Sequence, residues 1–219
     1  DIATKVKSAT GRDISIGGNL NVRLLPTPAL TVNDFSIANI AGATNAEMVK
    51  LDALQVRVAL LPLFSGELQV ERILLKNPVI NIEKLADGRV SWDFNAPSTK
   101  QSSAAVSKDN IASANADIRL DHFEISNATI VYIDSSTAKS STQKIEGLDA
   151  SLRAESISGP FAGNGKARFL GVPVSFDVSS GSIIEGRTIP INVSLLAPGE
   201  SRINVSGAVI GMGDNPHYK

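Results

Sequence analysis

The chain has 219 residues, of which 42% are hydrophobic, 20% charged and 5% aromatic, and its formal net charge is −1. It is long enough to bury a core, and its near-neutral charge argues against a basic surface for nucleic acid. Because the sequence contains no cysteine, disulfides, thiol catalysis and thiolate metal sites are excluded.

Residues 1–10 predict a short helix, because they lack glycine and proline and are followed by Gly11, a residue common just after a helix end. From Arg12 onward, apolar residues alternate with polar ones, which is typical of strands. The chain begins with Asp1 rather than Met, and we interpret it as an excised piece of a longer protein.

Three segments share one apolar pattern that ends in asparagine: residues 30–39 (LTVNDFSIAN), 68–77 (LQVERILLKN) and 118–127 (IRLDHFEISN). In each segment, two residues instead of one separate the two apolar pairs. Strict alternation would send the second pair to the other face, whereas a β-bulge absorbs the extra residue and bends the strand. The motif therefore predicts strands that curve alike, each ending at an Asn in a left-handed or turn conformation.

A second similarity, between residues 51–58 and 145–152, indicates a duplication with a period of about 90 residues. We predict an N-terminal helix and a first β repeat over residues 1–94, and a second β repeat over residues 117–219 that continues the same sheet. The Ser- and Ala-rich residues 95–116 predict a flexible linker. The expected fold is mainly β: a repeat-built, curled antiparallel sheet around a taco-like groove, with a short N-terminal helix.

Few residues could carry chemistry. We interpret His122 as part of a solvated strand face rather than as a catalytic base, because its neighbours Asp121 and Phe123 face the opposite way on a strand. The histidine spacing predicts no metal site, and the glycines lack the helix and lysine of a phosphate loop. Trp92 is interpreted as a capping core aromatic, with contact to a lipid or a partner as the alternative. We predict no enzymatic activity, no metal and no cofactor.

Residues 9–39 (ATGRDISIGGNLNVRLLPTPALTVNDFSIAN) and 48–94 (MVKLDALQVRVALLPLFSGELQVERILLKNPVINIEKLADGRVSWDF) resemble the amino-terminal region of the AsmA family. The matching elements are Gly11-Arg12 after a helix, Leu25-Pro26 with Pro28, the break LLPLF at residues 60–64, Asn77-Pro78, and the turn Asp87-Gly88 before Trp92.

The resemblance implies a protein of a Gram-negative bacterium, anchored in the inner membrane by one helix upstream of Asp1, with its body in the periplasm. It also implies similarity to bridge-like lipid-transfer proteins, whose taco-shaped sheets conduct acyl chains along an apolar interior, and a role in outer-membrane lipid homeostasis and biogenesis. The expected partners are phospholipid or another acyl lipid, and the membrane; no nucleic acid is expected. The family offers no catalytic residues to transfer.

A curled sheet with an apolar concave face must cover that face with a core, a partner or a lipid. The residues expected to line a lipid-binding groove are Leu54, Val56, Val58, Leu60, Leu68, Val70, Ile73, Leu75, Ile118, Leu120, Phe123 and Ile125. The alternative for the same residues is a closed, dry sandwich. A second hypothesis is a non-enzymatic structural or interaction module, whose sheet edges pair with a partner, with the rest of the protein, or with a second copy in an edge-to-edge homodimer.

Overall fold

The computed structural model describes residues 11–64, 69–93, 120–137, 139–154, 160–181, 188–199, 201–210 and 217–218. The predicted N-terminal helix (residues 1–10) and the predicted linker (residues 95–116) lie outside these ranges. Within them the chain is almost entirely β-structure, which confirms the mainly β fold expected from the alternation of apolar and polar residues.

The described residues form thirteen strands and one short helix, which coincides with the break at residues 60–64. Their bounds are β1 (Ile14–Ile16), β2 (Leu20–Arg23), β3 (Ala29–Ala38), β4 (Glu47–Val58), α2 (Leu60–Phe64), β5 (Val70–Lys76), β6 (Val79–Lys84), β7 (Leu120–Asp134), β8 (Ser141–Ala154), β9 (Phe161–Phe169), β10 (Val172–Ser180), β11 (Thr188–Ala197), β12 (Ser201–Ile210) and β13 (His217–Tyr218).

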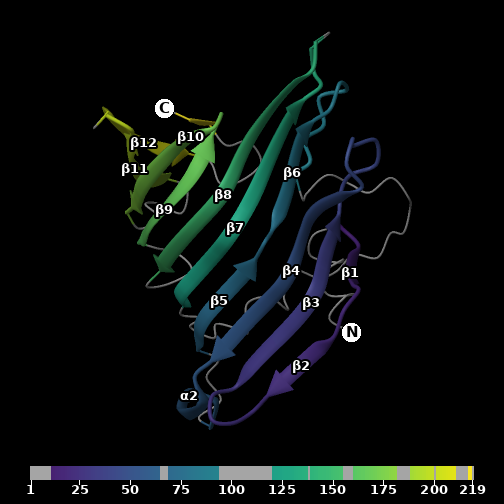
Figure 1. Ribbon diagram of the computed structural model, residues 1–219, viewed down its shortest axis with the longest axis vertical. Helices are drawn as coiled ribbons and strands as arrows, with labels where there is room; N and C mark the ends of the chain where they lie inside the picture. The colour runs from purple at the N-terminus through teal and green to yellow at the C-terminus, as the bar shows by residue number, and fades with distance from the viewer. Residues whose placement is uncertain are drawn as a thin grey trace.

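All thirteen described strands belong to one sheet, in the order β1-β3-β4-β5-β7-β8-β9-β10-β11-β12-β13, with β2 beside β3 and β6 between β4 and β7 (Figure 1). The described pairs are antiparallel except β5–β7 and β6–β7, which are parallel. The antiparallel arrangement expected from the sequence therefore holds within each half, and a parallel seam joins the halves. Parallel neighbours need a long crossover connection, which here includes residues 94–119.

The seam aligns the second and third Asn-ended motifs side by side, with Val70 beside Leu120 and Leu75 beside Ile125. Each strand has its extra residue just after the aligned pair Val70 and Leu120. The pairing of β5 with β4 shifts register at this position, and so does the pairing of β7 with β8. The bulges predicted for these two motifs are confirmed. Asn77 and Asn127 end the two motifs in the left-handed conformation, with φ of 49° and 55°.

The first motif differs from the other two. The register between β3 and β4 passes Asn33 and Phe35 without a shift, so the bulge predicted for this motif is absent from that ladder. The irregular residue is Asp34, whose φ is 50°. The register does not shift because β4 also has two residues, instead of one, between its apolar residues Leu51 and Leu54. The extra residues of β3 and β4 lie opposite each other in the ladder.

A line of polar side chains crosses the sheet at the left-handed residues, and we call it the polar line. The side chain of Asn77 donates a hydrogen bond to Asp52 (2.7 Å), and that of Asn127 donates one to Asn77 (2.9 Å). The backbone N–H of Asn127 donates to Asp149 (2.9 Å), whose other carboxylate oxygen lies 3.6 Å from the ammonium of Lys166. The polar line therefore links neighbouring strands from β4 to β9, and it passes through the left-handed residues Asn77 and Asn127.

A second polar cluster, where β6 ends, is buried. The guanidinium of Arg12 donates to the backbone oxygens of Ser91 (2.9 Å) and Asp93 (3.2 Å). Burial lowers the pKa of Arg12, and the charge of Asp93 partly opposes that shift. The carboxylate of Glu83 accepts hydrogen bonds from the backbone N–H (2.7 Å) and the hydroxyl (2.9 Å) of Thr44. These contacts tie residues far apart in sequence to the end of β6.

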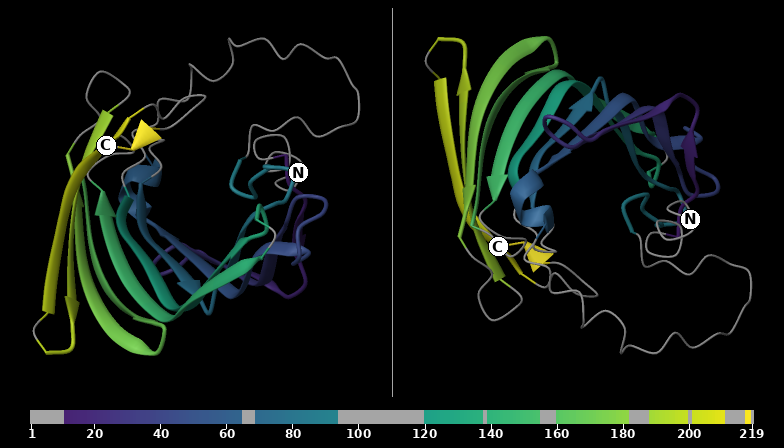
Figure 2. Two further views of the ribbon diagram at one scale, coloured as in Figure 1. Left: turned by 90° about the horizontal axis from the view of Figure 1, so that it is seen from above. Right: turned by 90° about the horizontal axis from the view of Figure 1, so that it is seen from below.

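The sheet is a single layer that curls into an open trough, as the end-on views show (Figure 2). Among the described strands, those that share extensive contacts are hydrogen-bonded neighbours. Among the described residues, no second layer covers either face of the sheet, although an apolar sheet face usually has such a cover.

Candidate functional site

Apolar residues, with one glycine in each row, form two rows across ten strands, from β2 to β12. Residues that pair directly across neighbouring strands point to the same face of a sheet, so each row lies on one face. The first row is Val22, Leu30, Val56, Ile73, Phe123, Leu152, Gly163, Val178, Val193 and Val205. The second row is Leu20, Val32, Leu54, Leu75, Ile125, Ala150, Gly165, Phe176, Leu195 and Ile203. We call the surface formed by these two rows the apolar face.

The row that lies between them in sequence points to the other side and is almost entirely polar. It consists of Asn21, Thr31, Gln55, Leu74, Glu124, Ser151, Asn164, Asp177, Ser194 and Asn204. Glu124 forms an ion pair there with Arg72. The sheet therefore has one apolar and one polar face, although neither is covered by a second layer of described residues.

At β9 and β10 the apolar face is the better shielded of the two, whereas on β4, β5 and β7 the residues of these rows are half-buried on both faces. Along β10, Phe176 and Val178 are half-buried, whereas the intervening Asp177 is exposed. Shielding is lost toward the edges of the sheet, where Val22 is 63% and Val205 is 54% exposed. This gradient arises because side chains at an edge of the described sheet have a neighbouring strand on one side only over most of their length.

Two glycines in β9 leave room on the apolar face. A Cβ at Gly165 would lie only 2.5 Å from Cζ of Phe176, so glycine allows this ring to lie against the backbone of the neighbouring strand. At Gly163, a Cβ would lie 3.1 Å from a methyl group of Leu152. The apolar face is therefore recessed at β9 relative to the neighbouring strands β8 and β10.

Most of the residues predicted to line a groove come together on neighbouring strands. Six of them (Leu54, Val56, Ile73, Leu75, Phe123 and Ile125) lie in the two rows of the apolar face. Val58, Val70 and Leu120 pair with one another in a third row beside them. Leu60 begins α2 instead of extending β4. Leu68 and Ile118 lie outside the described residues.

Sequence reasoning missed the continuation of the apolar face into both ends of the sheet. Leu30 and Val32 precede the predicted set, and Leu152, Phe176 and Val193 follow it. The available signal was the alternation within residues 172–180 and 188–197, which predicts strands. It does not predict their register against the first repeat, because register depends on pairing partners.

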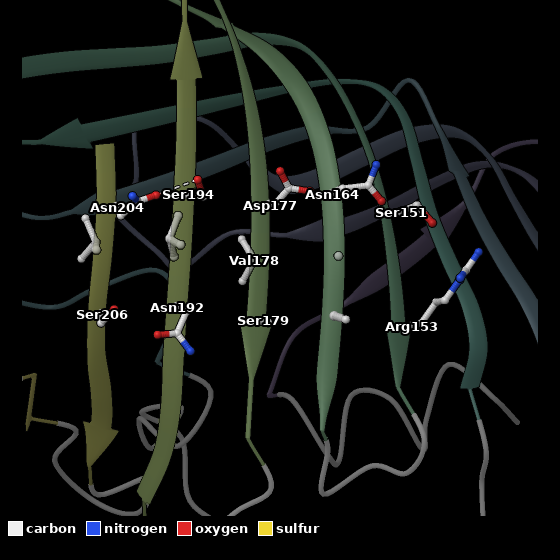
Figure 3. A pocket seen from close by; sticks show the side chains of 14 residues that line it. Ser151, Arg153, Asn164, Asp177, Val178, Ser179, Asn192, Ser194, Asn204 and Ser206 are labelled. Carbon is white, nitrogen blue, oxygen red and sulfur yellow. Dashed lines mark hydrogen bonds between the residues drawn. The ribbon is translucent and has the colours of Figure 1, made fainter. Parts of the chain in front are cut away.

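The polar face has a hollow of about 560 Å³ over β8 to β12 (Figure 3). Its side chains are mainly amides and hydroxyls, and the hydroxyl of Ser194 donates a hydrogen bond to Asn204 (2.8 Å). Arg153 and Asp177 are the charged residues in its lining. The lining contains no histidine to act as a base and none of the residues predicted for the groove. Such a surface can form hydrogen bonds with water or a polar ligand.

The two aromatic or titratable residues singled out in the sequence lie apart from that hollow. Trp92 is 45% exposed, and its ring centroid lies 6.3 Å from that of Tyr132, so it is not a buried core aromatic. His122 is half-buried on β7, paired with Arg72 on β5. Among the described residues, no group of three or more His, Cys, Asp or Glu side chains could hold a metal ion.

The model of the AsmA family matches residues 1–204. No curated protein matches the chain. Across the described residues, no helix reaches the length and hydropathy that a membrane-spanning segment requires.

Proposed function

The chain belongs to the AsmA family, and on that premise we propose that it binds the acyl chains of phospholipids along its apolar face and supports outer-membrane lipid homeostasis. Family membership implies a role in outer-membrane or lipid-related assembly. The finer assignment, to acyl chains and to this face, is the proposal. It is a binding or conducting function without catalysis.

The single observation that carries the proposal is the continuity of the apolar face. Ten strands spaced about 4.8 Å apart give rows about 43 Å long. The hydrocarbon core of a bilayer is about 30 Å thick, so one acyl chain reaches across about half of that. A row of this length can hold more than one chain end to end, or offer a path along which one chain moves.

The alternative for these residues is a closed, dry core. The partial exposure of the apolar face argues against closure, because residues of a dry core are almost completely buried. Leu54 and Val56, at the centre of the sheet, remain only half-buried. An acyl chain would cover these residues and remove apolar area from water, at about 25 cal/mol per Å².

The family is associated with the bacterial envelope. We propose further that the sheet lies in the periplasm of a Gram-negative bacterium and is attached to the inner membrane by a helix that precedes Asp1. The support for this location is the family alone. In that position the apolar face could receive lipid from the membrane to which the chain is attached.

The test compares two adjacent residues of β4 that point to opposite faces. Leu54 lies in the second apolar row and Gln55 in the polar row, and both are half-buried. We expect Leu54→Asp to reduce phospholipid co-purified from a membrane-containing host at least tenfold, because a carboxylate in the row would lose hydration on contact with an acyl chain. Gln55→Asp should retain lipid. The readout is native mass spectrometry.

Far-UV circular dichroism keeps the comparison interpretable, because both variants should retain the β signal. Equal lipid retention by the two variants would contradict the assignment of lipid to the apolar face. Loss of the β signal in Leu54→Asp alone would indicate that Leu54 belongs to a closed core, and would overturn the proposal.

A further inference from the structure

The apolar face continues beyond the polar line as a third row of paired residues. In β7, five positions separate Ile125 of the second row from Ile130, an odd spacing that normally places two residues on opposite faces. The left-handed residue Asn127 lies between them and acts as the extra residue of a bulge, so both point to the same face. The same spacing surrounds Gly147 in β8. The third row consists of Ile14, Ile37, Val49, Ile80, Ile130, Ile145 and Phe169.

An aromatic pair follows the third row. The next residues of β6 and β7 on the same face are Ile82 and Tyr132, which lie directly opposite each other. The segment after β6 returns antiparallel beside it, and the N–H of Ser91 donates a hydrogen bond to the carbonyl of Glu83 (2.8 Å). This register places Trp92 opposite Ile82. The ring centroid of Trp92 lies 6.3 Å from that of Tyr132, so the two rings meet beside the third row.

Charged residues begin one step beyond the two rings. On the same face of β6 and β7, Lys84 and Asp134 lie directly opposite each other and end the two strands. The surface therefore changes from apolar to charged across Trp92 and Tyr132. Both side chains combine an apolar ring with a polar N–H or O–H group, and they are enriched where an apolar region meets water. The aromatic pair occupies such a boundary.

The backbone around Trp92 is held in place, although the residue itself is 45% exposed. The guanidinium of Arg12 donates hydrogen bonds to the carbonyls of Ser91 and Asp93, the residues on either side of Trp92. Arg12 and Ser91 are both buried. A ring on a fixed backbone loses little conformational freedom when a ligand contacts it, which favours binding. Trp92 is therefore pre-organised for contact with a ligand.

We propose that Trp92 and Tyr132 contact a phospholipid where its acyl chains join its headgroup. The acyl chains then begin on the third row and extend along the apolar face, and the headgroup lies at Lys84 and Asp134. A phospholipid fits this place because it changes from apolar to charged over a short distance, as the surface does. This inference rests on the proposed function and deepens it, because it assigns the polar end of the lipid to one end of the apolar face.

The contact can be measured by fluorescence, because Trp92 is the single tryptophan of the chain. The chain is incubated with vesicles of phosphatidylcholine that carries bromine on its acyl chains, near either the carboxyl end or the methyl end, and is then separated from the vesicles by centrifugation. Bromine quenches tryptophan fluorescence only at short range. We expect carboxyl-end bromine to quench about half of the Trp92 emission and methyl-end bromine to quench far less, because the methyl end would lie several residues further along the face, at about 3.3 Å per residue of strand.

A second reporter separates this inference from the proposed function. In the double variant Trp92→Phe, Phe123→Trp, the single tryptophan lies in the first row, on the other side of the polar line. Quenching of this reporter without a stronger carboxyl-end effect at Trp92 would overturn the inference and leave the proposed function standing. That outcome includes the case in which another segment of the protein covers the ring. Absence of quenching at both positions would contradict the inference and the proposed function together.

Lipid retention gives a second measurement that needs no fluorescence. Trp92→Ala should lower the phospholipid retained per chain several-fold, measured as lipid phosphate after isolation. Trp92→Phe should retain most of the lipid, because a ring remains beside Tyr132. Far-UV circular dichroism should show the same β signal for both variants. Equal retention by the unmodified chain and Trp92→Ala, or a loss of the β signal in Trp92→Ala, would overturn the inference.

Discussion

Asn77 and Asn127 perform two tasks that few other residues could combine. Each holds a positive φ, which costs most L-residues about 1–2 kcal/mol but is tolerated by asparagine. Each also donates a side-chain hydrogen bond across the sheet, Asn77 to Asp52 and Asn127 to Asn77. The polar line therefore depends on residues that allow the backbone to bend and connect neighbouring strands at the bend.

The first prediction separates these two tasks. Asn127→Ala should lower the free energy of unfolding by about 2 kcal/mol, about half from strain at positive φ and half from the lost hydrogen bond. Asn127→Gly should lower it by about 1 kcal/mol, because glycine removes the strain but not the loss of the bond. The measurement is urea denaturation. An exposed control, Asn164→Ala on β9, should change stability by less than about 0.5 kcal/mol.

The asparagines that end the three motifs also show how far backbone conformation can be predicted from a residue pattern. A left-handed or turn conformation was predicted for all three motif ends, and Asn77 and Asn127 adopt it with positive φ. Asn39 follows β3 without a positive φ and precedes the turn at residues 41–42, while Asp34 takes the left-handed conformation within that strand. The sequence could not distinguish them, because Asp and Asn both tolerate this conformation and the choice depends on how β4 pairs with β3.

At the scale of elements, the buried cluster around Arg12 fixes the turn that follows β6. Arg12 is 6% exposed and Ser91 is completely buried. The hydroxyl of Ser91 accepts a hydrogen bond from the N–H of Glu83 (2.8 Å). The segment after β6 is therefore held from two sides, by a side chain from the start of the sheet and by the end of β6.

The second prediction concerns local opening of that segment. Arg12→Met removes the donors to the carbonyls of Ser91 and Asp93, which should cost about 2 kcal/mol. The amide of Ser91 should then exchange its hydrogen about 30-fold faster in native-state hydrogen exchange, whereas amides of β10 should be unaffected. Arg168→Met, an exposed arginine on β9, provides the control. Equal acceleration in β10 would indicate global rather than local destabilisation.

The strands could be predicted from the sequence more completely than their pairing. Alternation and the doubled spacers predicted the strands and two of the three bulges. The parallel seam was not predicted, because nothing within residues 68–77 or 118–127 states which segment lies beside them. The candidate face was found only in part for the same reason. Val56 and Ile73 were predicted from their own segments, whereas Val193 is connected to Ile73 only through five successive strand pairings.

At the scale of the whole molecule, the single layer has a measurable thermodynamic consequence. The faces of the described sheet have no covering layer and are already in contact with solvent in the folded state. Unfolding should therefore expose less new surface than it does for a compact protein of the same mass. Stability rests more on backbone hydrogen bonds between strands and less on a buried core.

The third prediction follows from that difference. The slope of unfolding free energy against urea concentration scales with the surface exposed on unfolding. For the lipid-free chain we expect a slope below that of compact two-layer proteins of equal length. Addition of phospholipid should raise the slope if acyl chains cover the apolar face. A lipid-free slope equal to that of compact proteins would indicate that the sheet closes on itself in solution.

The parallel seam has a consequence for the order of assembly during synthesis. Within each half, every strand can find its partner among segments already nearby in the chain, so the first half can form while the ribosome is still making the second. Only the contact between β5–β6 and β7 must wait for a distant segment to return. Until β7 has been synthesised, β5 and β6 form an unpaired edge of the first half of the sheet. During this interval the nascent chain is most prone to mispairing with another strand.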